Sequence, residues 1–444
     1  MDVNGFVKPC PWAIGYYGHI ADGFASVWNN NRVRVLRQCI AHNQLDPICA
    51  GASCPYVRSA AANQRTDRLK PYSANAYAFD GAFYLRRYKD LRQATKDGRL
   101  NSPHVHYLQY GKYEGRKARY TQYKITRKWI SRFDQAYYEH LYTDVARAVA
   151  NREFSCALEH FLMHGRFEQR QFRLSKHADN NCNYTRAMLD FMAGRNTTEA
   201  KPTILSIEAT STCNLACVMC PHAKQLVAEP KHQPVHTFER LLPAIGTQTR
   251  LQICGIGEPL LSPFFWRVVE FYNTPVGPHI RMNSNGTLWQ EANRRRILLS
   301  NVGEVSFSLD AATAETHRKI RGSNFTLVLR NIKQLIAERN ALHRATPIVY
   351  LNMTLMKENI HELGPFVALA KKLRVDRTRI WHLDNYVQHM EDWTVQRNGW
   401  TFDYAKQMLS NYPELSNRLI RQAVKKAETA GVPLQFISDR SVFF

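Results

Sequence analysis

From Pro202 onward, short apolar runs alternate with longer amphipathic stretches. The runs have the length and the β-branched content of strands, and the stretches between them have the periodicity of helices. Six runs begin near residues 203, 250, 279, 304, 348 and 378, and two helices with a short strand at 432–436 close the chain. Parallel strands need crossover helices, so this alternation is typical of a parallel sheet. We therefore predict an α/β domain over residues 201–444.

Three cysteines follow the first predicted strand within eight residues. Cys213, Cys217 and Cys220 have the spacing C-x3-C-x2-C, in the loop that leaves the strand at 203–208. Such a loop can curl three thiolates around one metal centre, and three are one short of the four that complete an ordinary zinc or iron–sulfur site. A [4Fe–4S] cluster held here would keep one iron open to an external ligand. Half of a zinc site is the alternative, although no second Cys or Cys/His pair follows at zinc-ribbon spacing.

At these cysteines the chain resembles the radical S-adenosylmethionine (SAM) superfamily, in which C-x3-C-x2-C lies after the first strand of a partial (β/α)6 barrel. The resemblance implies that the open iron chelates the amino and carboxylate groups of SAM. It also implies that one electron from the cluster cleaves the sulfonium to give methionine and a 5′-deoxyadenosyl radical. The implied cofactors are thus a [4Fe–4S] cluster and SAM, and the implied partner is an electron donor such as flavodoxin or ferredoxin.

Two glycine-containing turns extend the resemblance. The segment Gly255-Ile-Gly-Glu-Pro259 follows the second strand and is similar to the GGEP motif of the family, with Ile256 inserted into the glycine pair. The resemblance implies that Glu258 meets the amino group of SAM. The segment Ser284-Asn-Gly286 ends the third strand and is similar to the TNG turn near the ribose and methionine parts of SAM.

Polar residues at later strand ends complete the predicted cofactor site. Ser308 and Asp310 close the fourth strand, and Arg321 matches a family arginine near the SAM carboxylate. Asp310 could instead cap the next helix. The sixth strand ends in polar residues that would face the substrate, namely His382, Asp384 and Asn385. The residues that the resemblance assigns to SAM are Glu258, Ser284, Asn285, Ser308 and Arg321, with the thioether of Met219 packing on the adenine.

The first 58 residues carry a second group of cysteines. A G-x4-C motif ends at Cys10, and a Trp-Asn dipeptide, an Arg-rich helical run and the pair Cys49 and Cys54 follow it. This order is similar to the end of a SPASM or twitch extension, the C-terminal module that holds auxiliary iron–sulfur clusters. Three ligands would leave a second cluster incomplete, and a small zinc knuckle or free thiols are the alternatives. We expect this segment to be loosely packed, as the remnant of an upstream enzyme or as a permuted module.

The middle of the chain contains an internal repeat. Phe79–Asp90 matches Phe133–Asp144, and His106–Arg116 matches His160–Arg170, always 54 positions apart. Apolar and aromatic positions recur at helical spacing, which predicts two tandem helical units packed against each other. The repeated histidines, His106 and His160, are predicted to be hydrogen-bonded core residues rather than metal ligands. The units resemble Phe-Asp-x-x-Tyr-Tyr modules of bacterial glycan-related and repeat-containing proteins, which suggests docking rather than catalysis.

The chain is strongly basic, with 60 Lys and Arg against 37 Asp and Glu and a formal charge of +23. The excess is spread along the chain, so a solvated basic surface and an RNA or anionic-polymer partner both stay open. No apolar run is long enough to span a membrane and no secretory signal is recognisable, which favours a reducing, cytoplasmic location. The ten cysteines are then metal ligands and buried thiols rather than a disulfide framework.

We therefore predict a radical SAM enzyme that modifies a peptide, protein or sugar-like substrate at the mouth of a partial (β/α)6 barrel. The alternatives are an RNA-modifying radical SAM enzyme and a non-catalytic fragment that binds a partner through its repeats. The predicted order is an auxiliary-cluster segment (1–58), a linker (59–73), an all-α tandem repeat (74–176), a second linker (177–200) and the radical SAM core (201–444).

Overall fold

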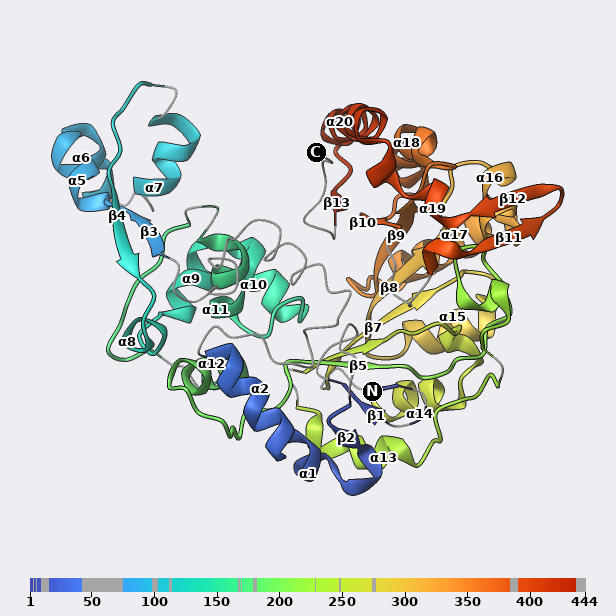
Figure 1. The fold of residues 1–444 in the computed structure, drawn as a ribbon. Coiled ribbons are helices and arrows are strands. Elements are labelled where there is room, and N and C mark those ends of the chain that lie inside the picture. The colour runs from blue at the N-terminus through green and yellow to red at the C-terminus, as the bar shows by residue number, and fades with distance from the viewer. Residues whose placement is uncertain are drawn as a thin grey trace. The chain divides into compact units, whose positions relative to one another are not determined.

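A computed structural model describes residues 1–2, 4, 6–8, 16–41, 75–97, 103–111, 114–166, 168, 170–178, 182–227, 229–246, 249–273, 277–383 and 390–436. These residues form two units (Figure 1). Residues 1–30 and 204–436 belong to the first unit, and residues 31–41 and 75–203 belong to the second.

The first unit is built on a parallel sheet. Among the described residues it has seven strands in the order β13-β10-β9-β8-β7-β6-β5, and every neighbouring pair is parallel. From β5 to β10 each strand lies beside its predecessor in the chain, so their carboxyl ends share one edge. The predicted α/β fold is thereby confirmed and is consistent with a partial barrel. The strands are β5 (Ile204–Ile207), β6 (Arg250–Ile253), β7 (His279–Ser284), β8 (Val302–Ser308), β9 (Ile348–Leu355), β10 (Arg377–His382) and β13 (Leu434–Phe436).

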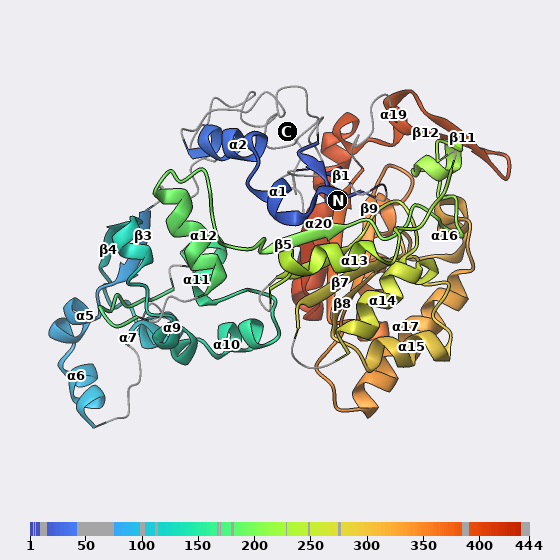
Figure 2. The ribbon, with the colours of Figure 1, turned by 90° about the horizontal axis from the view of Figure 1, so that it is seen from below.

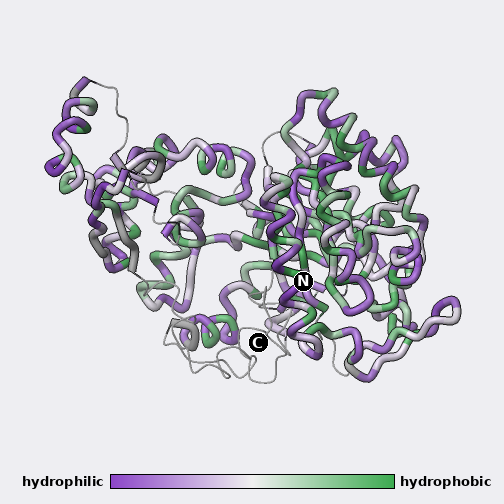
Figure 3. The backbone as a smooth tube through the Cα atoms, turned by 90° about the horizontal axis from the view of Figure 1, so that it is seen from above, coloured by the Kyte–Doolittle hydropathy of each residue, from purple (hydrophilic) through white to green (hydrophobic). Residues whose placement is uncertain are grey.

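Helices pack on this sheet and form the main core with it (Figures 1 and 2). Phe264 of α14 and Ile332 of α17 are fully buried in the same cluster as Val305 of β8. Each such side chain stabilises the fold by about 1.5–3 kcal/mol relative to its exposed state. Hydrophobic residues recur along these strands and helices (Figure 3). The helices are α1 (Phe24–Trp28), α13 (Thr237–Leu241), α14 (Pro263–Phe271), α15 (Glu291–Leu298), α16 (Ala314–Arg321), α17 (Phe325–Ala341), α18 (Leu363–Leu373), α19 (Tyr404–Gln407) and α20 (Pro413–Ala430).

A β-hairpin follows the sixth strand, where the sequence reasoning expected only helices and a short strand. Strands β11 (Thr394–Arg397) and β12 (Trp400–Asp403) pair antiparallel. Asn398 and Gly399 form the turn, with φ angles of 50° and 77°. An Asn-Gly pair adopts positive φ readily and is the strongest short-range hairpin signal. The buried Phe402 packs in one cluster with Val218 and Ile320, which joins the hairpin to the cysteine loop and to α16.

The described N-terminal residues pack on the sheet unit. Two short strands, β1 (Phe6–Val7) and β2 (Gly18–His19), pair antiparallel, and Ile20 is 2% exposed within the main core cluster. The Met1 nitrogen donates to Ser206 O at 2.8 Å, and the Glu208 amide donates to Met1 O at 3.1 Å. The expectation of loose packing is wrong for these residues, because their apolar side chains cover part of the barrel core. Cys10, Cys49 and Cys54 lie outside the described residues.

The second unit contains both copies of the repeat. The middle region is not all-α as predicted, because β4 (Tyr120–Lys124), which contains two tyrosines and a threonine, pairs antiparallel with β3 (Asn75–Phe79). None of the helices in the described residues of the chain combines the length and apolar character needed to cross a lipid bilayer. The helices of this unit are α2 (Asn31–Ala41), α5 (Gly81–Arg87), α6 (Lys89–Lys96), α7 (Pro103–His106), α8 (Arg127–Ile130), α9 (Gln135–Leu141), α10 (Thr143–Ala150), α11 (Ala157–His160) and α12 (Asn183–Met192).

The two copies of the repeat make the same contacts. In the second copy, the Tyr138 hydroxyl lies 3.3 Å from His160 Nδ1, and in the first copy the Tyr84 hydroxyl lies 3.3 Å from His106 Nδ1. Burial lowers the pKa of His160 to about 4, which keeps its ring neutral. Both repeated histidines are thus hydrogen-bonded as predicted, and His160 is a buried core residue, whereas His106 is half-buried.

Candidate functional site

The cysteine loop leaves β5 at the carboxyl edge of the sheet. Cys217 is 7% exposed, whereas Cys213 and Cys220 are half-buried. The loop is fixed at several backbone positions: the Glu258 amide donates to Thr212 O at 2.9 Å, and the Val218 amide donates to Ile320 O at 3.0 Å. A side chain at Gly257 would collide with the Thr210 and Thr212 carbonyls, so this glycine permits the close approach of the two loops.

Burial and the charge of Arg321 act in opposite directions on the pKa values of the three cysteine thiols. Burial raises the pKa of each thiol, that of Cys220 to about 12, while the charge of Arg321 opposes this rise. Among the described residues, no three His, Cys, Asp or Glu side chains come close enough to hold one metal ion. Three soft sulfur donors beside the positive charge of Arg321 have the chemistry that an iron–sulfur cluster requires.

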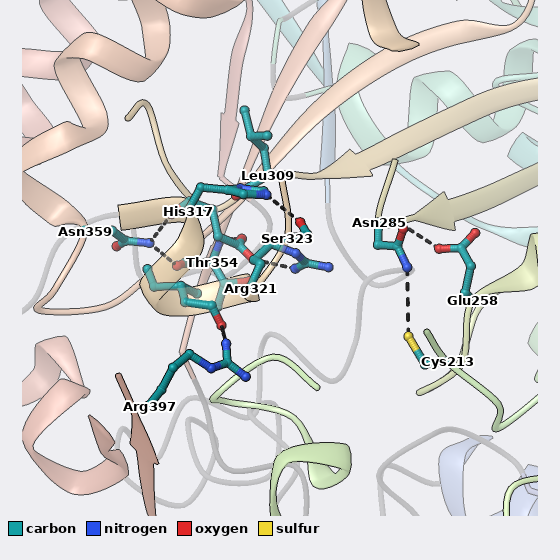
Figure 4. Close-up of polar contacts among 12 residues, drawn as sticks. Cys213, Glu258, Asn285, Leu309, His317, Arg321, Ser323, Thr354, Asn359 and Arg397 are labelled. Carbon is teal, nitrogen blue, oxygen red and sulfur yellow. Dashed lines mark hydrogen bonds and ion pairs between the residues drawn. The ribbon is translucent and has the colours of Figure 1, made fainter. Parts of the chain in front are cut away.

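Glu258 is the centre of a buried network at the carboxyl ends of β6 and β7. Its side chain is 1% exposed and accepts hydrogen bonds from the Ser284 hydroxyl at 2.9 Å and from the Asn285 amide at 2.7 Å. Burial raises the pKa of Glu258 to about 7, although these bonds favour the ionised form. Figure 4 shows Asn285 between Glu258 and Cys213, with a hydrogen bond drawn to each of them. The side-chain nitrogen of Asn285, Nδ2, lies 3.9 Å from Cys213 Sγ and donates to Asn214 Oδ1 at 2.8 Å.

A second network joins β8 to α16. Arg321 Nη1 donates to Asp310 Oδ2 at 2.6 Å, and both side chains are buried. Asp310 Oδ1 also accepts the Thr354 amide at 2.7 Å. The alternative that Asp310 caps the next helix is wrong, because Thr313 occupies the cap position of α16. The buried Nε of Arg321 has no hydrogen-bond partner among the described residues. It is therefore available to an anionic group.

The remaining predicted residues lie at different places. Ser308 ends β8 and is half-buried, and Met219 packs in the cluster that contains Val218 and Ile320. His382 ends β10, 6.4 Å from the ring of Phe436, while Asp384 and Asn385 lie outside the described residues.

Two residues that the sequence reasoning missed also belong to the site. Asn214 lies between the first two cysteines, and Arg397 extends from the β11–β12 hairpin to Ala216 O. Arg318, Arg321 and Arg397 line a cavity of about 420 Å³ together with residues 214–216. A hairpin signal was present at Asn398-Gly399, but no local pattern relates that hairpin to cysteines so distant in the sequence.

The fold and the site together define an α/β protein of the partial-barrel type, with three cysteines after the first strand of its sheet. Residues 207–370 match the model described as "Radical SAM superfamily". These residues form a radical SAM domain, so the predicted family is confirmed. The match supports the predicted cofactors of this domain, a [4Fe–4S] cluster and SAM.

Curated relatives agree with this assignment. The mycofactocin maturase MftC of Mycobacterium ulcerans is 31% identical over 188 residues, covering 40% of this chain and 48% of that protein. The AdoMet-dependent heme synthase of Methanosarcina barkeri is 29% identical over 180 residues, covering 39% and 48%. The chain thus spans about half the length of these relatives. Among solved structures, Streptococcus suis SuiB bound to S-adenosylmethionine aligns over 72% of this chain and 68% of that one, at 13% identity and a TM-score of 0.44.

Proposed function

We propose that this chain is a radical SAM enzyme that cleaves SAM reductively and abstracts a hydrogen atom from its substrate. The observation that carries the proposal is the position of the three cysteines. They lie on a loop at the carboxyl edge of the sheet, beside the Glu258–Asn285 network and the Arg321–Asp310 pair. In this proposal Cys213, Cys217 and Cys220 hold the [4Fe–4S] cluster. When bound, the cluster supplies one electron to SAM, and the remaining iron site binds the cofactor.

The residues of the chain bind and orient SAM in this proposal. Arg321 is preorganised, because Asp310 fixes one face of its guanidinium while its Nε stays available for a carboxylate. Glu258 already accepts three hydrogen bonds, from Ser284, Asn285 and the Leu260 amide. Its first role is therefore to fix the turn at residues 284–286, and its ionised form would attract the ammonium of SAM. Ser308 adds a hydroxyl at the same sheet edge.

A peptide or protein is the substrate class that we propose, with a dedicated electron donor. The support is that several relatives are named as maturases, a word for enzymes that process a precursor. Other relatives are named a heme synthase and a GTP cyclase, so a small molecule is the second candidate.

The test is anaerobic reconstitution with iron and sulfide, followed by reduction in the presence of SAM. We expect 5′-deoxyadenosine by liquid chromatography and mass spectrometry. A variant with Cys213, Cys217 and Cys220 all changed to Ala should lose both the bound iron and the product. Cys254→Ala is the matched control, because this cysteine directly follows β6, outside the cysteine loop, and should change neither. Product from the triple variant at the wild-type rate would contradict the proposal.

A further inference from the structure

The guanidinium of Arg397 crosses from the β11–β12 hairpin to the cysteine loop. Its Nη2 donates to Ala216 O, and its Nη1 donates to Ile320 O at 3.0 Å and to Lys319 O at 3.3 Å. Figure 4 shows this side chain pointing toward the segment that carries Arg321. One side chain therefore links three carbonyl groups from two segments that are far apart in the sequence.

These contacts bracket Cys217. Ala216, directly before this cysteine, is held by Arg397, and Val218, directly after it, donates its amide to Ile320 O at 3.0 Å. Arg397 donates to the same Ile320 oxygen, so both sides of Cys217 are tied to the end of α16. A single guanidinium is well suited to this task, because its planar fork directs several donors at fixed angles.

The hairpin presents Arg397 from a rigid position. Val395 is 8% exposed and Phe402 is fully buried in the cluster that also contains Val218. The C-terminal cap of α16, Gly322, has a φ of 73°, and a side chain there would come within 3.1 Å of Arg397 Nη1. The path of the arginine thus requires a residue without a side chain at the end of α16.

The charge of Arg397 faces the cysteine loop rather than a carboxylate. Its three acceptors are neutral carbonyls, and the structure gives no ion pair for it among the described residues. The positive charge is therefore best compensated when the loop carries negative charge.

We propose that Arg397 is a positioning residue that holds the cysteine loop in its cluster-binding shape and supplies a positive charge to the bound cluster. The first part concerns the metal-free chain, and the second part rests on the proposed function. Arg397 lies outside the matched residues 207–370, so the β11–β12 hairpin becomes part of the cluster site.

The first experiment measures alkylation of each cysteine by iodoacetamide in the metal-free, reduced chain, with peptide mass spectrometry. Arg397→Gln should increase the labelling rate of Cys217 by about tenfold or more, because it removes charge-assisted hydrogen bonds from the loop. The reagent must reach the Cys217 thiol to label it, and the wild-type loop leaves this residue only 7% exposed. An increase therefore reports opening of the loop. Arg418→Gln, an exposed site on α20, is the matched control, and the buried Cys156 is the internal reference.

The second experiment compares reconstituted wild type, Arg397→Lys and Arg397→Gln by iron content and by redox titration with electron paramagnetic resonance. We expect less iron in both variants, and a more negative midpoint potential only in Arg397→Gln, because the lysine keeps the charge. Unchanged Cys217 labelling together with unchanged iron content would overturn the inference. If wild type binds no cluster, the proposed function fails, whereas the labelling result still decides the loop-holding role.

Discussion

Replacement of Glu258 by Gln tests the buried network directly. The folded-state pKa of this carboxyl is about 7 against an ordinary value of 4.5, because burial disfavours its charge. A raised pKa means that the folded chain binds the proton more tightly than the unfolded chain. The stabilisation is therefore fully present below about pH 4.5, and it is lost as the pH rises through about 7. At about 1.4 kcal/mol per unit, this difference amounts to about 3 kcal/mol.

The Glu258→Gln side chain cannot ionise, so its contribution to stability no longer depends on pH. The substitution also replaces one accepting oxygen of the network by an NH2 group. The glutamine oxygen can accept either the Ser284 hydroxyl or the Asn285 amide, and its NH2 group must then face the other donor. An unsatisfied buried donor costs about 1–3 kcal/mol. The variant should thus be less stable than wild type at pH 5, and the difference should shrink by up to about 3 kcal/mol by pH 8.

The assay is urea unfolding of the metal-free wild type and variant at pH 5, 6, 7 and 8, followed by fluorescence of Trp289, whose indole donates to Ser284 Oγ at 2.8 Å. At each pH, the free energy of unfolding of the variant is subtracted from that of wild type, so that the contributions of the other titrating groups cancel. A difference that is constant across this range, or that grows with pH, would refute the reasoning. This outcome would mean that Glu258 is ionised in the folded chain at all pH values tested.

Further predictions concern single contacts. Arg321→Lys should raise the SAM dissociation constant about tenfold in calorimetry, because it keeps the charge beside Asp310 but loses the Nε donor; unchanged affinity would contradict the role of Nε. Gly165→Ala should destabilise the second unit by about 2 kcal/mol or more in thermal unfolding, because its side chain would collide with the Tyr138 hydroxyl. The Cys182 thiol should be alkylated at pH 7 faster than that of Cys156, because its hydrogen bonds with Cys156 and with the amide and hydroxyl of Thr185 lower the pKa of Cys182; Thr185→Val, which removes the hydroxyl, should slow this labelling. A variant with Cys10, Cys49 and Cys54 changed to Ala should bind less iron than wild type if these residues hold a second cluster.

Local patterns predicted most of the sheet. Strands such as β7 and β9 were identified to within one or two residues, because apolar residues alternate with polar ones in β7 and form a longer run in β9. The grouping of Glu258 with Ser284 and Asn285 was also predictable, since parallel neighbours place their carboxyl ends together. The pairing of Asp310 with Arg321 was not, because it depends on the angle at which α16 packs. Arg397 shows the same limit, since its acceptors are backbone carbonyls that carry no sequence signal.

The edge strand β5 carries the cysteine loop, and its position has a consequence for association between chains. An edge strand offers unpaired backbone groups on which a strand of another molecule can add, which leads to aggregation. The Met1 backbone occupies two of these groups, the Ser206 carbonyl and the Glu208 amide. These contacts make the β5 edge of the sheet a poor template for pairing with a strand of another molecule.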